Sequence, residues 1–574
     1  MISGRIQGQV MGNKTEAMHS LWLEKAAADA DLKSELRDIQ GDWARIEDAF
    51  NSDLVFGTGG LRGIIGAGTN RMNVYTVAKA SQGLADYVVR LFPVERRSIA
   101  VSRDSRIKSD LFARVAAEVF AANGITVHVY SRIMPTPCLS FAVRELHCAA
   151  GVMITASHNS AKYNGYKVYS ASGCQITTET ASDIQAEIAK LDVFSDIKRT
   201  DHDDAVAVGM IRYIPDEVYT KYLEQVKKQS LLRKNETADK GIAVVYSPLN
   251  GTGLKPVTRV LTEAGYTNVM VVPEQEQPDG NFPTCPHPNP ENPEAMALGL
   301  KYAKMKNADT LLATDPDCDR IGVAVKSGND YQLLSGNEVG ILLLDYICAR
   351  RTANSTMPDD PVMIKTIVTT DMGERIAARY CVRTINVLTG FKFIGEQINL
   401  LESWGKADQF IFGFEESCGY LSGAYVRDKD AVGAALLICE MIAHYKALGL
   451  TLADKLKDLY AAYGYCLNTL HSYEFGGALG LGKMQAIMHK LRAGTKAVDG
   501  KKVLQVLDYA VGIDELPKSD VLKFILEDSC SVVVRPSGTE PKLKAYVSVM
   551  AKNSEAATLV EAEIAAYLRS LFEL

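Results

Sequence analysis

Four polar loops in this sequence carry residue types that could do chemistry, and each lies beside a short apolar run. The first is T-A-S-H-N, in which Ser157 is followed by His158 and Asn159. The Gly-x-Ser-x-Gly elbow of hydrolases is missing, and His158 is a sequence neighbour of the serine rather than a group from another loop. A serine that carries a phosphoryl group suits this loop better, with a helix-capping serine as the alternative.

The second loop, D-P-D-C-D-R, places Asp315, Asp317 and Asp319 at alternate positions between two apolar runs. Three carboxylates that turn toward one point favour a hard divalent cation. An EF-hand would need glycine at the sixth position and glutamate at the twelfth, where this sequence has Arg320 and Lys326. Three aspartate ligands leave room for a phosphate oxygen on Mg²⁺. The alternative is a polar turn whose charges are solvated.

The third and fourth loops suit a sugar and a phosphate. G-F-E-E-S-C-G, residues 413–419, supplies two neighbouring carboxylates and a serine, which can accept hydrogen bonds from sugar hydroxyls. R-P-S-G-T-E-P-K, residues 535–542, combines an arginine with backbone and hydroxyl donors in a turn, which favours a phosphate. It lacks the Walker spacing, so ATP binding is not indicated. Ordinary turns are the alternative for both loops.

Alternating apolar strands and helices are the elements that must position these loops. The sequence predicts strands at 98–102, 126–130, 149–155, 241–246, 268–272, 310–314, 321–325 and 362–368. This alternation indicates parallel α/β sheets, whose strands collect ligands at their carboxyl ends. Residues 17–50 are typical of charged helix. The last part of the chain is typical of a separate α+β domain.

Length and composition exclude several classes of protein. The chain has 574 residues, of which 47% are hydrophobic and 23% charged, so we expect several folded domains. A net charge of −6 offers no basic field for nucleic acid. The sequence predicts neither a membrane span nor a signal peptide. Its 11 cysteines form no C-x-x-C pair, which favours reduced thiols and a cytoplasmic location.

The four loops together resemble the signature loops of the α-D-phosphohexomutase family, in the same order and over nearly the whole chain. D-P-D-C-D-R and T-A-S-H-N-S-A-K-Y-N-G are the most specific matches. The resemblance implies a four-domain, heart-shaped α/β architecture around a central cleft, with three α/β domains and a smaller, mobile C-terminal α+β domain. We expect a phosphoserine domain at 1–207, a metal domain at 208–333, a sugar-binding domain at 334–460 and a phosphate-binding domain at 461–574.

The resemblance also implies roles for individual residues. Ser157 would be the phosphoserine and, with Asp315, Asp317 and Asp319, a ligand of Mg²⁺. His158, Lys167 and Arg62 would complete the catalytic set, with Lys167 or His158 as the general base. The residues expected to bind substrate are Arg103, Arg320, Lys392, Glu415, Ser417, Arg427, Lys429, Arg535, Ser537, Gly538 and Thr539.

The implied activity is a phosphoryl transfer of the isomerase class. F-G-T-G-G-L-R-G and N-R-M-N are closest to the phosphoglucomutase/phosphopentomutase branch. This branch implies interconversion of glucose 1-phosphate and glucose 6-phosphate, with glucose 1,6-bisphosphate as intermediate and activator. The sugar loop departs from G-E-E-S-F-G at Phe414 and Cys418, so pentose, mannose and amino-sugar phosphates stay open as substrates, as does a non-catalytic sugar-phosphate sensor. We expect a monomer or weak homodimer whose partners are small sugar phosphates, not nucleic acid or membrane.

Overall fold

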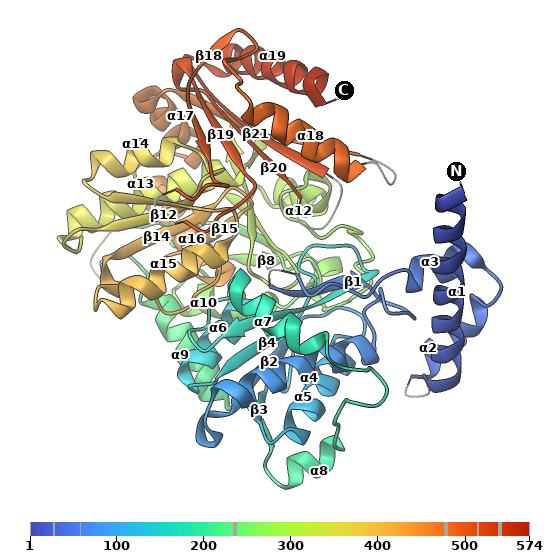
Figure 1. Ribbon diagram of the computed structural model, residues 1–574. Coiled ribbons are helices and arrows are strands. Elements are labelled where there is room, and N and C mark those ends of the chain that lie inside the picture. The colour runs from blue at the N-terminus through green and yellow to red at the C-terminus, as the bar shows by residue number, and fades with distance from the viewer. Residues whose placement is uncertain are drawn as a thin grey trace.

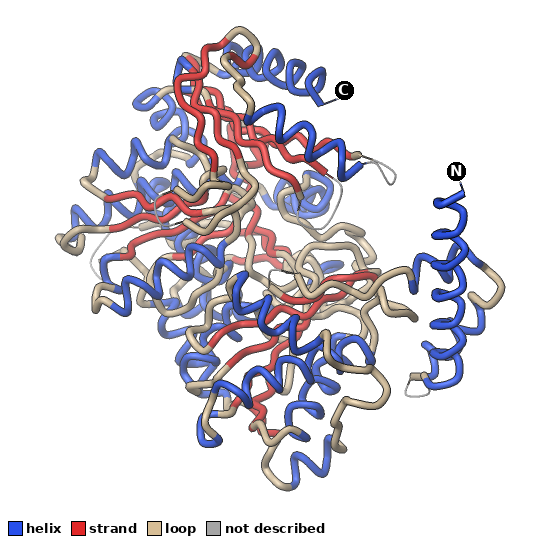
Figure 2. Tube along the Cα trace, in the orientation of Figure 1, coloured by secondary structure: helices blue, strands red, loops and turns tan. Residues whose placement is uncertain are grey.

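The computed structural model describes residues 2–26, 29–57, 59–233, 238–475, 480–513, 516–537 and 542–572. Within these residues the chain builds four sheets that follow one another along the sequence, each flanked by helices (Figures 1 and 2). The domain limits at 207, 333 and 460 stay predictions, and the last strand of the first sheet, β6, lies just beyond the first of them.

The first sheet has six strands in the order β1-β5-β4-β2-β3-β6. Its strands are β1 Gly60–Ile64, β2 Ser98–Arg103, β3 Thr126–Val129, β4 Ala150–Ile154, β5 Tyr163–Ser170 and β6 Ile211–Tyr213. β2 pairs in parallel with β3 and β4, but β5 pairs antiparallel with both β4 and β1. The expected α/β sheet is therefore mixed, with a parallel centre at β2, β3 and β4, because β4 and β5 are joined by a loop rather than by a crossover helix.

Helices α4 to α8 accompany this sheet, and three further helices precede it. Their bounds are α1 Ile2–Lys25, α2 Ala30–Asp38, α3 Trp43–Phe50, α4 Val74–Leu91, α5 Ser109–Ala122, α6 Thr136–Glu145, α7 Thr178–Ile188 and α8 His202–Ala207. Asp29 and Asp42 cap α2 and α3, which divides the helical region predicted at 17–50. Figure 1 shows α1, α2 and α3 grouped on one side of the molecule. The buried Trp22 ring packs edge-on against Tyr75 and Phe194, which anchors α1.

The second and third sheets are also mixed, with strand orders β11-β10-β9-β7-β8 and β13-β12-β14-β15. Their strands are β7 Val244–Ser247, β8 Val269–Val271, β9 Thr310–Thr314, β10 Ile321–Ser327, β11 Asp330–Leu334, β12 Val362–Thr366, β13 Arg383–Val387, β14 Phe410–Glu415 and β15 Gly419–Leu421. Their helices are α9 Asp216–Lys227, α10 Leu254–Glu263, α11 Pro273–Glu276, α12 Pro293–Lys306, α13 Gly336–Asn354, α14 Met372–Arg379, α15 Phe391–Ser403, α16 Ala431–Ala447 and α17 Leu452–Tyr463. β9 turns directly back into β10, which makes this pair antiparallel.

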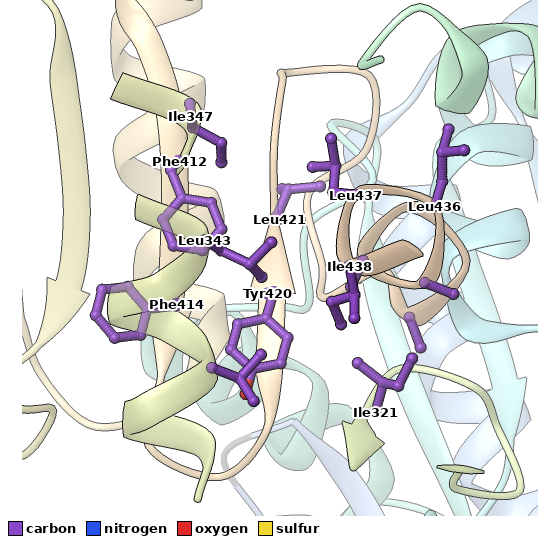
Figure 3. Close-up of a cluster of buried hydrophobic side chains, with 14 of the residues drawn as sticks. Ile321, Leu343, Ile347, Phe412, Phe414, Tyr420, Leu421, Leu436, Leu437 and Ile438 are labelled. Atoms are coloured by element: carbon purple, nitrogen blue, oxygen red, sulfur yellow. The ribbon is translucent and has the colours of Figure 1, made fainter. Parts of the chain in front are cut away.

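One hydrophobic cluster joins the second and third sheets (Figure 3). Leu343 of α13 lies against Phe412 and Tyr420, and Ile438 of α16 lies between them and Ile321 of β10. Burying each such side chain contributes about 1.5–3 kcal/mol. The two sheets therefore form one packed body, from which the metal and sugar loops both emerge.

The fourth sheet is antiparallel throughout, in the order β16-β21-β20-β19-β18-β17. Its elements are β16 Tyr465–Glu474, α18 Gly480–Arg492, β17 Ala497–Val498, β18 Lys501–Asp508, β19 Leu522–Leu526, β20 Ser531–Pro536, β21 Lys542–Ala551 and α19 Ser554–Phe572. This unit has its own hydrophobic cluster. It joins α17 through Gly464, whose φ of 91° lies in the region that favours glycine.

Among the described residues, no single helix is both long and apolar enough for a membrane span. The pair α16 and α17, bent by 87°, passes that test only when the two are taken together, by length and composition alone.

Candidate active site

The loop after β4 holds Ser157 in a left-handed backbone conformation, with φ of 51°. Such a conformation costs a non-glycine residue about 1–3 kcal/mol, so surrounding contacts must maintain it. The Thr155 hydroxyl accepts a hydrogen bond from the Ser157 amide at 2.8 Å. Ser157 Oγ, only 3% exposed as a residue, donates to Asp315 Oδ2 at 2.8 Å and lies 3.1 Å from His158 Nδ1. The structure thus brings the predicted phosphoserine directly to the predicted metal loop.

Arg106 supports this loop from behind and was not among the sequence-predicted residues. Its buried guanidinium donates hydrogen bonds to four backbone carbonyls of the loop, those of Ser157, Asn159, Ser160 and Tyr163. Asp104 Oδ2 lies 3.4 Å from its Nε, and the Phe282 ring from the second domain covers it at 5.0 Å. The signal that could have found Arg106 is the pair Asp104-x-Arg106 directly after an apolar strand.

The three aspartates of D-P-D-C-D-R converge between β9 and β10, where their residues are 0–1% exposed. One carboxylate oxygen from each lies within 4.8 Å of the other two. Oδ1 of Asp317 and Oδ1 of Asp319 have no hydrogen-bond partner in the described part of the chain. Buried carboxylate oxygens without partners are costly, so this donor set fits a hard divalent cation.

Two lysines balance part of this negative charge. Lys167 Nζ, on β5, lies 2.8 Å from Asp317 Oδ2 and 3.4 Å from Asp319 Oδ2. Lys429 Nζ lies 3.2 Å from Asp319 Oδ2 and 3.8 Å from Glu415 Oε1. Lys429 therefore links the metal loop to the sugar loop.

The pKa values of these groups follow from burial and from their neighbours. Burial, and then the Asp317 and Asp319 charges, raise the pKa of Asp315 well above its ordinary value. Burial alone would also raise the pKa of Asp317, but the Lys167 ammonium holds it well below the ordinary value. Burial, and then the Arg320 and Arg62 charges, lower the pKa of His158. The site therefore combines a neutral imidazole with a lysine that stays charged beside carboxylates.

The three predicted arginines Arg62, Arg320 and Arg103 have different partners. Arg62 Nη1 donates to Asn159 Oδ1 at 3.2 Å, beside the serine loop. Arg320 Nη1 is paired with Glu291 at 2.6 Å. Arg103 binds the Tyr130 carbonyl at 3.0 Å and the exposed Asp110 at 2.7 Å.

The sugar loop continues β14 into β15, with Glu415 Oε1 3.8 Å from Lys429 Nζ and Ser417 in the turn between the two strands. The two residues that depart from the family pattern, Phe414 and Cys418, lie in the hydrophobic core. Phe414 is fully buried and stacks on Phe412 in the core shown in Figure 3. Cys418 is 2% exposed and belongs to the same hydrophobic cluster. Neither departure places a new side chain where Glu415 and Ser417 lie.

Arg427 and Lys392, both predicted to bind substrate, have different surroundings. The Arg427 guanidinium is fully buried inside the third domain, 2.6 Å from Asn399 Oδ1 and 2.8 Å from Glu402 Oε2. A substrate role for Arg427 has no support in this geometry. Lys392 lies in the first turn of α15, and burial lowers the pKa of its ammonium.

The predicted phosphate loop leaves β20 at Arg535, whose Nη2 donates to Tyr546 Oη at 3.2 Å. Ser537 donates its amide to the Lys542 carbonyl at 2.7 Å. Gly538 and Thr539 lie outside the described residues. Tyr546 also packs in a small cluster with Ile367 and Val368 of the third domain. The phosphate loop is thus carried by a sheet that rests on the third domain.

Comparison with protein-family models gives four matches, in the order of the four sheets. They are the α/β/α domains I, II and III of phosphoglucomutase/phosphomannomutase, at residues 53–193, 219–328 and 335–463, and the C-terminal domain of the same family at 489–566.

Whole-chain relatives agree with these matches. A phosphoglucomutase of Staphylococcus saprophyticus is 36% identical over 94% of this chain and 98% of its own, and one of Staphylococcus aureus USA300 is 35% identical over 93% and 96%. The crystal structure of a phosphoglucomutase/phosphomannomutase family protein from Burkholderia thailandensis superposes with a TM-score of 0.67 at 18% identity, covering 91% of this chain and 98% of that one.

Proposed function

Because this chain belongs to the α-D-phosphohexomutase family and is an isomerase of that family, we propose that it interconverts glucose 1-phosphate and glucose 6-phosphate through a phosphoserine at Ser157. The observation that carries the proposal is the 2.8 Å hydrogen bond from Ser157 Oγ to Asp315, at the edge of the buried aspartate cluster. A serine oxygen beside three converging carboxylates is the arrangement that a metal-assisted phosphoryl transfer requires.

Asp315, Asp317 and Asp319, with the phosphorylated Ser157, would hold Mg²⁺. Their unpartnered oxygens are hard ligands of the kind this ion prefers. Bound there, Mg²⁺ would withdraw charge from the transferring phosphoryl oxygens.

In the first step, the free hydroxyl of the sugar phosphate attacks the phosphorus on Ser157. The bond from Ser157 Oγ to phosphorus breaks, a bond from the sugar oxygen forms, and a bisphosphate results. His158, whose imidazole is neutral, accepts the hydroxyl proton, and Ser157 Oγ leaves beside the charged Lys167 ammonium. Arg62 faces the same loop and offers a fixed positive charge to the transferring group.

In the second step, the bisphosphate turns over and Ser157 Oγ, deprotonated since the first transfer, attacks the other phosphorus. The bond from that phosphorus to its sugar oxygen breaks, and this oxygen takes back the proton held by His158. The net result is a phosphate moved between C1 and C6, with the serine phosphorylated again. Glu415 and Ser417 would accept or donate hydrogen bonds with the sugar hydroxyls, while Arg535 and Ser537 would hold the phosphate that is not reacting. Glucose 1,6-bisphosphate would therefore serve as both intermediate and activator.

The core positions of Phe414 and Cys418 support a glucose substrate, since both sequence departures of the sugar loop are accounted for by packing. Pentose and mannose phosphates remain the alternatives with the same mechanism. Relative kcat/KM values on glucose 1-phosphate, ribose 1-phosphate and mannose 1-phosphate separate the three.

The test of the reaction class is a coupled assay that follows glucose 6-phosphate from glucose 1-phosphate, with Mg²⁺ and a trace of glucose 1,6-bisphosphate. We expect turnover that disappears when EDTA removes the metal. Turnover on ribose or mannose 1-phosphate, without turnover on glucose 1-phosphate, would change the substrate assigned here and leave the proposed mechanism intact. No turnover on any of these, with unmodified Ser157, would favour a sugar-phosphate sensor.

A further inference from the structure

A long proline-rich loop, residues 277–292, joins α11 to α12 in the second domain. It contains neither a helix nor a strand among the described elements. Irregular loops longer than about 12–15 residues are uncommon in compact domains and are usually functional. The first half of this loop contacts the group that supports the serine loop, and its second half contacts the arginine that follows the metal aspartates.

The first half of the proline-rich loop packs on the backbone of the first domain. A Cβ at Gly280 would lie 2.5 Å from the Ile107 amide nitrogen and 2.7 Å from the Ser105 carbonyl oxygen, so the two backbones approach in a way that only glycine allows. Phe282 is 1% exposed, and its ring centre lies 5.0 Å from the Arg106 guanidinium carbon. With φ of 48°, Phe282 is in a conformation that costs about 1–3 kcal/mol and must be held by its surroundings.

The Phe282 ring therefore closes one side of the pocket that holds Arg106. The Arg106 side chain is fully buried, and its guanidinium serves the four carbonyls of the serine loop. A guanidinium over an aromatic face gains about 0.5–2 kcal/mol, and the ring also prevents it from turning away from these carbonyls. Phe282 thus fixes the group that fixes the serine loop.

The second half of the proline-rich loop packs on β10, beside the metal loop. A Cβ at Gly322 would lie 2.4 Å from the Pro290 carbonyl oxygen, so the loop backbone lies directly on the strand. The next residue, Glu291, accepts a hydrogen bond at Oε1 from Arg320 Nη1 at 2.6 Å. The Glu291 amide donates to Asn289 Oδ1 at 3.2 Å, which stabilises the turn that carries this carboxylate.

Arg320 is held at one nitrogen and unpaired at another. Its side chain is 17% exposed, and Nη1 is the nitrogen bound by Glu291. Its Nε lies 3.9 Å from Asp319 Oδ1 and has no hydrogen-bond partner within the described ranges. A buried donor without a partner is costly, and a guanidinium whose direction is fixed can offer such a donor to an anionic oxygen. Glu291 thus sets the direction of Arg320 beside the metal loop.

We propose that the proline-rich loop is a positioning element for the phosphoryl transfer, in which Phe282 fixes Arg106 behind the serine loop and Glu291 fixes Arg320 beside the metal loop. Phe282 and Glu291 are positioning residues, because each acts through an arginine. One loop of the second domain thereby controls the position of both reacting loops. The effect on turnover rests on the proposed function, whereas the effect on the two loops does not.

Hydrogen exchange of the full-length protein, read by mass spectrometry, tests the positioning itself. Phe282→Leu should speed exchange at residues 157–163 about fivefold or more and leave residues 318–321 unchanged. Glu291→Ala should do the reverse. His287→Ala is the matched control, because His287 is an exposed residue of the same loop. A variant that exchanges like this control at its own segment would overturn its half of the proposal.

A second readout separates positioning from general destabilisation. In Phe282→Leu, exchange in β2 should keep the parental rate, because β2 lies in the same domain but outside the serine loop. Faster exchange throughout β2 would mean that the first domain is loosened as a whole, and would overturn the positioning role of Phe282. Glu291 is exposed, so its variants test the second half without loss of a buried side chain.

Kinetics then test whether this positioning serves the reaction. Phe282→Leu should lower kcat about tenfold. Glu291→Ala should lower kcat/KM about tenfold, and Glu291→Gln, which keeps an acceptor oxygen, about threefold. In an Arg320→Met background, Glu291→Ala should cost less than about twofold, because its effect passes through the guanidinium.

Two kinetic results would overturn the proposal. One is a parental kcat in Phe282→Leu, and the other is a pair of losses that multiply in the double variant of Glu291 and Arg320. If no sugar phosphate is turned over, the proposed function fails, and the exchange experiment still decides whether the proline-rich loop positions the two segments.

Discussion

The serine end and the phosphate-loop end of the candidate site are built in different ways. Around Ser157, side chains of the first two domains bond to one another, as in the contacts from the buried Ser157 to Asp315 and from the half-buried Lys167 to Asp317. At the other end, Arg535 is half-buried and its guanidinium donates to and lies over Tyr546 of its own sheet. The serine end is therefore fixed by contacts between domains, while the phosphate-loop end is carried by the fourth domain.

This difference suits the two tasks of the proposed reaction. The transferring phosphoryl group needs cations and acceptors placed before it moves, because small displacements there are costly. The phosphate-loop end must bind either phosphate of a bisphosphate that turns over. A loop carried by a separate domain suits this task better than one fixed between domains.

Replacing the serine should break the fixed end completely. Ser157→Ala removes the phosphoryl carrier, and kcat should fall at least about 10³-fold. Ser160→Ala is the matched control, because it removes a hydroxyl from the same loop and keeps the carbonyl that Arg106 binds. Near-parental turnover by Ser157→Ala would show that the serine does not carry the group.

Replacing Arg106 should loosen the fixed end without touching a reacting atom. In Arg106→Lys one ammonium must replace a guanidinium that serves four carbonyls, so kcat should fall about 10²-fold with KM changed much less. Phosphorylation of Ser157, read by mass spectrometry, should become incomplete. A folded variant with the parental kcat would mean that the loop keeps its shape without Arg106.

Replacing Arg535 at the phosphate-loop end should change KM more than kcat, the reverse of what is expected at the serine end. Arg535→Ala should raise KM about 10- to 100-fold with a smaller loss in kcat, since it removes a charge that binds the non-reacting phosphate. Steady-state kinetics on glucose 1-phosphate measure both constants. An unchanged kcat/KM would remove Arg535 from the phosphate site.

Replacing Lys523 should weaken the contact between the fourth domain and the third. Its Nζ reaches across to the third domain, 3.1 Å from Asp371 Oδ1 and 3.3 Å from the Ile367 carbonyl. Lys523→Met should lower kcat/KM about two- to fivefold and speed hydrogen exchange at residues 367–371. Lys501→Met is the control, because the Lys501–Asp528 pair lies within the fourth domain. Equal exchange in the two variants would argue against this contact.

The smallest effect on activity is expected at Glu416, which joins the sugar loop to the hydroxyls of Thr366 and Thr369 at 3.2 and 3.3 Å. Burial and the neighbouring Glu415 carboxylate raise the pKa of Glu416 from 4.5 to about 7. Between these values the folded chain holds a proton that the unfolded chain releases, so stability should fall as the pH rises through this window.

Glu416→Gln should reduce the loss in free energy of unfolding between low and high pH by at most about 3 kcal/mol. Urea unfolding of parent and variant at about pH 5 and about pH 8 measures the difference. Parallel pH dependences would place the Glu416 pKa near its ordinary value.

Local motifs and strand patterns predicted much of this molecule. The strand expected at 310–314 is β9, Thr310–Thr314, and the aspartate loop after it converges as its alternation indicated. The antiparallel returns of β5 and β10 were missed, because local apolar patterns do not reveal strand direction. The same limit applies to the capping aspartates that divide the N-terminal helices.

Side-chain partners far apart in the sequence could not be predicted in this way. Arg106 and Arg427 are both arginines near strand ends or loops, and only the folded chain shows that Arg106 binds the serine loop while Arg427 is buried against Glu402. Phe414 likewise looked like a change in the sugar loop and proves to be a core residue.

The central claim is that Ser157 carries the phosphoryl group through the reaction. The most direct measurement incubates the protein and Mg²⁺ with glucose 1,6-bisphosphate labelled in its phosphates, and maps the labelled peptide by tandem mass spectrometry. We expect up to one labelled phosphate per chain, on Ser157, which passes to sugar when unlabelled glucose 1-phosphate is added. Turnover with Ser157 unlabelled, or label on another residue that passes to sugar, would contradict it.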